Sequence, residues 1–131
     1  RPTHNSRPEE VESHVRGYTI LNDLDCLDQE RRTARKTFNG SGPLWHCIDT
    51  EVDPVGLEME THINGNLRQH DNTEQMFIKP REIISFLSAR FTLSRDDVIS
   101  FGSPANPGLL KPTDEIEIWY ENIGTLRNTV E

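Results

Sequence analysis

The chain has 131 residues, which is the size of one ordinary domain, and we expect residues 1–131 to form a single one. Only 33% of the residues are hydrophobic, so the core is expected to be modest. The formal net charge of −8 argues against nucleic acid or an anionic membrane surface as a partner, although it leaves room for a small anionic ligand.

Signals for location and redox state are few. The first residues, Arg1 to Asn5, lack the apolar stretch of a secretory signal, and no apolar run in the sequence approaches the ~20 residues of a membrane helix. Two cysteines, Cys26 and Cys47, do not make a disulfide scaffold in a chain of this size. We therefore expect a cytoplasmic protein with reduced cysteines.

The N-terminal segment is predicted to form a short helix and then a buried strand. Ser6 is suited to cap a helix and Pro8 to occupy its first turn, which predicts a helix over about Pro8–Val15. After Gly17, the apolar residues of Tyr18–Asp23 predict a buried strand.

Acidic and then basic residues follow this strand. Asp23, Asp25 and Asp28 lie close together, and a basic stretch, Arg31–Lys36, comes next. Mg²⁺ takes oxygen ligands and is usually held by one or two carboxylates plus water and substrate. The pattern therefore favours a site for a metal ion and an anionic substrate, on a polar loop over residues 25–42 of the length that is usually functional or disordered.

The middle of the chain predicts three strands. Residues 44–48 are expected to form a short one. Residues 57–63 alternate apolar and polar side chains, with the period of two that is typical of a half-buried strand. Asn64-Gly65 follows at once and is the strongest short signal for a hairpin, so residues 66–70 are expected to return antiparallel.

The C-terminal half is predicted to contain a second helix and three further strands. The helix opens at Pro80, and its buried stripe at helical spacing consists of Ile83, Ile84, Leu87 and Phe91. The strands are expected over residues 98–102, 115–121 and 125–130. The chain as a whole is thus expected to be mainly β with two helices, an α+β fold.

Five short segments carry a recognisable pattern. They are Gly17–Asp23 (Gly-Tyr-Thr-Ile-Leu-Asn-Asp), Lys36–Phe38, Ile63–Gln69 (Ile-Asn-Gly-Asn-Leu-Arg-Gln), Gly102–Pro104 and Gly124–Val130. In order and approximate spacing, from about Glu9 to the end of the chain, they resemble the fumarylacetoacetate hydrolase family.

The resemblance implies a fold, an activity and a partner. The fold would be a mixed β-sandwich roll built from several small sheets, in a protein that is usually a homodimer. Family members hydrolyse or decarboxylate 2-oxo acids and 1,3-dicarbonyl acids, or isomerise or hydrate related compounds, typically with Mg²⁺ or Mn²⁺. A small anionic 2-oxo acid and one of these cations are therefore the implied ligands.

The resemblance also implies site residues. Asp23 falls on the family's aspartate metal ligand, and Lys36 falls on the lysine that contacts the substrate's oxyanion. Gly102 and Ser103 fall on the family's Gly-Thr-Pro turn, where Ser103 would donate to the substrate carboxylate in place of threonine and the neighbouring amides would assist. Arg32 and Arg35, by their charge, are expected to guide the anion inward.

Three departures from the family pattern bear on activity. The family's Glu-x-Glu metal ligands precede the region that aligns with residues 1–5, so we expect a chain truncated at its N-terminus with an incomplete metal site. The family's arginine after the Asn-Asp pair has become Leu27. The loop over Asp28–Lys36 is also shorter than is common.

Other uses of the polar residues stay open from the sequence. Asp25 and Asp28 can be solvated loop residues, as can the basic stretch that follows them. Cys26 and Cys47 do not have the spacing of a zinc site. His46 and Cys47 are adjacent and would point to opposite faces of a strand, which argues against a Cys–His nucleophile pair.

The sequence leaves three hypotheses about function. The first is an enzyme that cleaves C–C bonds as a hydrolase or decarboxylase, acting on a small 2-oxo acid or an acylpyruvate-like 1,3-dicarbonyl acid. The second is a catalytically incomplete remnant that serves as a structural or dimerisation module. The third is an anion-binding protein that uses the cations of residues 31–36. Arg68 and Gln69 are expected to have a structural role, gripping a turn.

Overall fold

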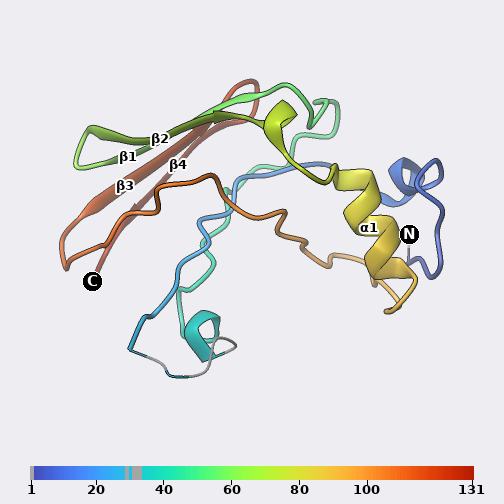
Figure 1. Cartoon of the computed structure of the whole chain (residues 1–131), viewed down its shortest axis with the longest axis horizontal. Coiled ribbons are helices and arrows are strands. Elements are labelled where there is room, and N and C mark those ends of the chain that lie inside the picture. Colours follow the sequence, from blue (N-terminus) through green and yellow to red (C-terminus); the bar gives the residue numbers. More distant parts are fainter. Residues whose placement is uncertain (1, 29, 31–33) are drawn as a thin grey trace.

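The structure, a computed structural model, describes residues 2–28, 30 and 34–131. A four-stranded antiparallel sheet has the strand order β2-β1-β3-β4, and the sheet and the helix α1 lie toward opposite ends of the molecule (Figure 1). The strands are β1 (Glu58–Ile63), β2 (Asn66–Asn72), β3 (Glu115–Tyr120) and β4 (Gly124–Thr129). The expected mainly β, α+β character is confirmed as this one sheet with few helices.

One face of the sheet forms the core. In β1, Met59 and Thr61 are buried while Glu58 and Glu60, which alternate with them, are half-buried, because successive side chains of a strand point to opposite faces. Ile20, which comes from outside the sheet, joins the buried cluster of the inner face. The other buried members of that cluster are Met59, Ile116, Ile118 and Leu126.

A hairpin and a β-bulge set the register of β1 against β2. Asn64 and Gly65 both have positive φ, 51° and 74°, as the two-residue turn of a β-hairpin requires, so the hairpin predicted at this pair is confirmed. The pairing of β1 with β2 shifts between Thr61, opposite Gln69, and His62, opposite Leu67. The residue left over in β2 is Arg68, which makes this irregularity a β-bulge.

The second predicted helix is confirmed as α1 (Pro80–Ser88). Proline occupies its first turn, where the missing N–H costs nothing, and Ile84 is buried. Phe91, predicted to extend the buried stripe, lies beyond the helix and is 60% exposed, so that part of the prediction is wrong. The helix ends before it, and the capping amides at its C-terminus bond to Leu87 and Ser85.

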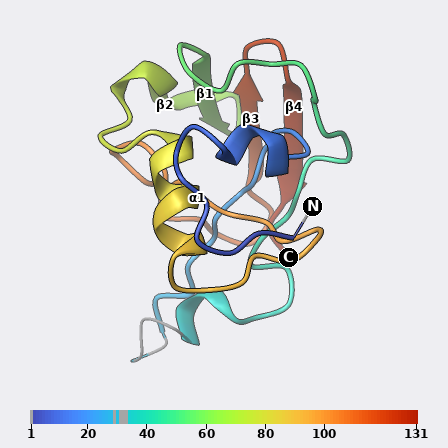
Figure 2. The same cartoon turned by 90° about the vertical axis from the view of Figure 1, so that its right-hand side faces the viewer.

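The first predicted helix is wrong in type and extent. In place of an α-helix over Pro8–Val15 there is a single 3-10 turn, η1 (Val11–His14), and such short turns need little regular hydrogen bonding. The N-terminal segment instead wraps around α1 (Figure 2). Ser85 of α1 donates to the carbonyl oxygen of Ser6 at 2.7 Å, and α1 also contacts η1.

Three predicted strands are not regular strands. Residues 18–23 and 44–48 pair through isolated bridges, Tyr18 with Asp49 and Leu21 with Leu44, and form an irregular antiparallel ribbon, called here the Tyr18–Asp49 ribbon. Residues 98–102 pair with no strand of the described chain. Gly102 has φ 93°, outside the range of an extended strand, and Pro104 follows it closely.

Two further short 3-10 turns complete the described structure: η2 (Ala34–Lys36) and η3 (Thr73–Gln75). The prediction of a functional loop over residues 25–42 therefore includes one ordered turn, while Gln29 and residues 31–33 lie outside the described residues. Within the part of the chain that the structure describes, no helix has the length and apolar character needed to cross a membrane.

Candidate functional site

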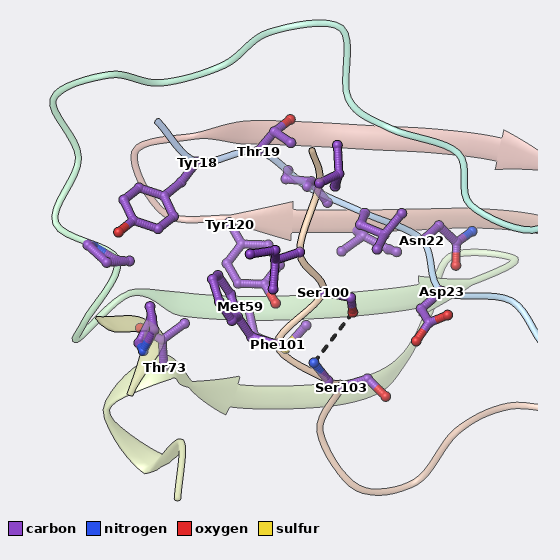
Figure 3. A pocket seen from close by; sticks show the side chains of 18 of the residues that line it. Tyr18, Thr19, Asn22, Asp23, Met59, Thr73, Ser100, Phe101, Ser103 and Tyr120 are labelled. Atoms are coloured by element: carbon purple, nitrogen blue, oxygen red, sulfur yellow. Dashed lines mark hydrogen bonds between the residues drawn. The ribbon is translucent and has the colours of Figure 1, made fainter. Parts of the chain in front are cut away.

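A large cavity lies under the inner face of the sheet. Its volume is about 1670 Å³, above the roughly 300–1,000 Å³ of typical small-molecule sites. The Tyr18–Asp49 ribbon, the sheet and residues 98–110 supply its walls. Asp23, Asn22, Ser103, Tyr18 and Tyr120 are seen around it in close view (Figure 3).

The ribbon delivers Asp23 to one end of the cavity. The amide of Asn22 donates to the carbonyl oxygen of Pro43 at 3.0 Å, and its side-chain amide donates to Asn128 of β4 at 3.1 Å. Asn22 is itself buried. A polar side chain that is buried and paired holds the backbone in one place, so the next side chain, Asp23, is aimed from a fixed point.

Asp23 and Lys36 meet at this end of the cavity. The Lys36 Nζ lies 2.5 Å from Asp23 Oδ1 and 3.4 Å from Asp25 Oδ1. The bond from the ammonium to Asp23 raises the pKa of Lys36, and the charge of Asp25 adds to the rise. Asp25 therefore lies within reach of the ammonium, although its side chain stays 46% exposed. A solvated position for Asp25 was one of the alternatives left open by the sequence.

Lys36 is held in place by the turn that carries it. Its carbonyl oxygen accepts a bond from the Ser41 hydroxyl at 2.8 Å, and the amide of Cys26 donates to the carbonyl oxygen of Arg35 at 2.9 Å. These bonds tie the two limbs of the loop together across the acidic residues. Lys36 lines the cavity and Arg35 does not, so the inward guiding role expected for Arg35 has no support from its position.

Gly102 and Ser103 reach the same cavity from the segment between α1 and β3. Gly102 has φ 93°, a conformation that favours glycine, and its amide donates to the Ser100 hydroxyl at 3.4 Å (dashed line in Figure 3). The structure therefore brings four of the expected site residues to one cavity: Asp23, Lys36, Gly102 and Ser103.

Other lining residues of the cavity are more apolar and were not assigned from the sequence. Tyr18, Met59, Phe101 and Tyr120 line the cavity, and burial raises the pKa of both tyrosines. The signal for Tyr120 was present in the alternation of its strand, which puts it on the inner face. The alternation alone carries no information on the cavity beneath that face.

The donors at this end of the cavity make up only part of a metal site. Asp23 and Asp25 offer hard oxygen donors of the kind that Mg²⁺ prefers, but Lys36 already bridges them. Among the described residues, no group of three or more histidine, cysteine, aspartate or glutamate side chains is placed to hold a metal ion. These residues by themselves fit a divalent cation in kind but do not make up a full ligand set.

Comparison with known proteins identifies the family. A family model described as fumarylacetoacetate (FAA) hydrolase, C-terminal, matches residues 1–131. The chain belongs to the fumarylacetoacetate hydrolase family.

Individual relatives agree with this assignment. An uncharacterised protein of Methanocaldococcus jannaschii is 35% identical over 131 residues, 97% of this chain and 55% of the relative. The oxaloacetate tautomerase YisK of Bacillus subtilis is 32% identical over 93% of this chain and 45% of its own length. The chain thus spans about half the length of the curated relatives it matches.

A solved structure has the same fold. The 2-hydroxyhepta-2,4-diene-1,7-dioate isomerase from Mycobacterium marinum superposes with a TM-score of 0.96 at 35% identity, over 99% of this chain and 53% of that chain. The irregular ribbon and the segment over residues 98–110 are therefore part of the fold of this family, since a superposition over nearly the whole chain includes them.

Proposed function

We propose that this protein acts on a small 2-oxo acid or an acylpyruvate-like 1,3-dicarbonyl acid by stabilising its enolate. Tautomerisation and isomerisation, the reactions named for the two relatives above, both move a proton next to the carbonyl of such an acid. Hydrolytic or decarboxylative cleavage of a C–C bond also places negative charge on an enolate oxygen, in this case that of the 2-oxo acid released. The shared step is therefore the one to assign to the site.

The observation that carries this proposal is the Asp23–Lys36 pair at the end of the cavity. An ammonium fixed by two carboxylates is a preorganised positive charge, and such charges lower the energy of an oxyanion more than mobile ones do. The exposed fraction of the Lys36 side chain is 47%, so a ligand can reach it. Lys36 is thus a local positive charge on a chain whose formal net charge is −8.

Each residue of the site has a proposed task. Lys36 holds its charge beside the developing enolate oxygen. Ser103 donates its hydroxyl hydrogen to the substrate carboxylate, and the backbone amides near Gly102 assist it. Asp23 keeps Lys36 in position and offers one oxygen ligand to a divalent cation, Mg²⁺ or Mn²⁺. When bound, such a cation polarises a carbonyl group as a Lewis acid.

The test is a turnover assay with oxaloacetate and with an acylpyruvate in the presence of Mg²⁺. Enol content is followed by absorbance, and release of pyruvate is followed separately. Lys36→Met is expected to lower kcat/KM by about 10²–10³-fold, the usual loss when one oxyanion-stabilising group is removed. The matched control is Arg127→Ala, because Arg127 pairs with Glu117 at 2.5 Å and does not line the cavity.

A second candidate is a non-catalytic module that keeps the fold. The observation in its favour is the incomplete ligand set among the described residues. No turnover of either substrate by the unaltered protein, with a melting temperature that Mg²⁺ and dicarboxylates leave unchanged, would favour this candidate over the enzyme. Equal turnover by the unaltered protein and Lys36→Met would place the chemistry elsewhere.

A further inference from the structure

The segment that carries Ser103 has little backbone support of its own. In the described structure, residues 98–110 make no backbone-to-backbone hydrogen bond with the rest of the chain. Pro104 and Pro107 lack an N–H, so at both positions the segment offers acceptors without donors. A segment of this kind needs donors from another element to stay in one place.

Two neighbouring side chains of β2 supply those donors. The side-chain amide of Gln69 donates to the carbonyl oxygens of Pro104 at 3.0 Å and Ala105 at 3.1 Å. The Arg68 guanidinium donates to the carbonyl oxygen of Pro107 at 2.9 Å. Three bonds therefore hold the turn directly after Ser103, and the structural role expected for this pair is confirmed.

The β-bulge explains how both residues reach the same segment. Adjacent residues of a regular strand point to opposite faces. Arg68 is the extra residue of β2, and a bulge of this kind turns a side chain in a new direction and is over-represented next to active sites. Gln69 lines the cavity. Arg68 lies against the same segment, since a Cβ placed on Gly108 would be 3.6 Å from the Arg68 Nε.

We infer that Arg68 and Gln69 are positioning residues that hold Ser103 at the cavity, facing the same space as Asp23 and Lys36. This inference rests on the proposed function for the role of Ser103. Gln69 satisfies two adjacent carbonyl groups with one amide nitrogen, so its loss frees both at once. Without it, the hydrogen bonds between residues 98–110 and the rest of the described chain are reduced to the one from Arg68.

The first arm of the test measures motion and is independent of activity. Backbone order parameters from ¹⁵N relaxation are compared in the unaltered protein, Gln69→Ala and the control Asn66→Ala. Asn66 is also an amide on β2, but its side chain bonds within the hairpin turn, to Asn64 at 3.1 Å. The order parameter of the Ser103 amide is expected to fall from about 0.85 to below about 0.6 in Gln69→Ala. In the control it is expected to stay unchanged.

The second arm tests whether the pair acts through Ser103. With oxaloacetate and Mg²⁺, Gln69→Ala is expected to lower kcat at least about tenfold, because Ser103 would no longer be held in place beside the substrate. The double variant Gln69→Ala/Ser103→Ala is expected to lose no more than Ser103→Ala alone. Arg68→Lys, which keeps a donor for Pro107, is expected to retain more activity than Arg68→Met.

The outcomes separate this inference from the proposed function. An unchanged order parameter at Ser103 in Gln69→Ala overturns the inference whatever the activity. Losses that multiply in the double variant overturn it as well, because the two residues would then act independently. If the unaltered protein turns over neither substrate but the relaxation result is as expected, the positioning role of Arg68 and Gln69 stands and the proposed function fails. Circular dichroism checks that each variant is folded.

Discussion

Asp23 affects the protonation of Lys36, and Lys36 affects the orientation of Asp23. The carboxylate keeps the ammonium charged, because the hydrogen bond to Asp23 raises the pKa of Lys36, and the ammonium keeps the carboxylate turned toward the cavity. Both side chains remain partly exposed, 47% for Lys36 and 30% for Asp23. An exposed ion pair contributes little to stability, about 0–1 kcal/mol, which agrees with the binding role proposed for this pair.

His62 gives a test of electrostatics away from the cavity. Its ring nitrogen lies 2.8 Å from Glu60 Oε2, and that bond, with the charges of Glu60 and Glu117, raises the pKa of His62. A raised pKa in the folded state means that the stabilising contribution is fully present below about pH 6.5, the unfolded value. It is lost as pH rises through the folded pKa.

We therefore expect the free energy of unfolding to fall as pH rises above about 6.5, with a smaller fall in His62→Gln. Urea titrations at four pH values across this range measure it. Glu60→Gln serves as the partner control, since it removes the charge that His62 faces and is expected to flatten the curve in the same way. An identical pH dependence in the unaltered protein and both variants would contradict the assignment.

At the scale of elements, the sheet was predictable and the ribbon was not. The alternation over residues 57–63 and 115–121 and the turn at Asn64-Gly65 are local signals, and the strands formed where they predict. The Tyr18–Asp49 ribbon has the apolar residues of a strand, but its pairing is broken into isolated bridges. Which stretches pair in a ladder depends on partners distant in sequence, and propensity carries little of that information.

The site was predictable to a similar extent. Asp23, Lys36 and Ser103 came from resemblance, and the structure places all three at one cavity. Arg35 stands next to Lys36 in sequence, yet consecutive residues of a tight turn point in different directions, so sequence proximity did not bring it to the cavity. The bulge at Arg68 left no local signal, because it arises from the pairing of two strands.

Gly17 tests whether the ribbon holds the site in place. A Cβ at this position would lie 2.2 Å from the carbonyl oxygen of Asp49, the same oxygen that accepts the Tyr18 amide at 2.8 Å. Gly17→Ala is therefore expected to break this pairing and destabilise the protein by more than about 1 kcal/mol. Gly42→Ala is the control, because its Cβ would meet Leu21 at an ordinary 3.4 Å.

Chemical denaturation measures both changes, and turnover of oxaloacetate reports on the site. A loss of turnover in Gly17→Ala at a temperature where it remains folded would show that the ribbon positions Asp23. Equal stability of the two glycine variants would show instead that the ribbon adapts to a side chain at position 17.

For the molecule as a whole, metal binding is the property that is easiest to test. The described residues bring two carboxylates and a competing ammonium together, and Mg²⁺ gives up its water reluctantly. We expect the 131-residue chain to bind Mg²⁺ alone weakly, with a Kd of about 1 mM or above, equivalent to no more than roughly 4 kcal/mol. Isothermal titration calorimetry checks this, with Asp23→Asn as the variant, and a micromolar Kd would contradict it.

The shared site of Asp23 and Lys36 is tested most directly by binding of oxalate, a stable dianion that resembles the enolate of a 2-oxo acid. Calorimetry at saturating Mg²⁺ compares the unaltered protein with Lys36→Met and the control Arg127→Ala. We predict that Lys36→Met binds oxalate at least about tenfold more weakly, as expected for a charge-assisted bond worth roughly 1.5–3 kcal/mol, and that the control binds it normally. Equal oxalate affinity in the unaltered protein and Lys36→Met would contradict the account.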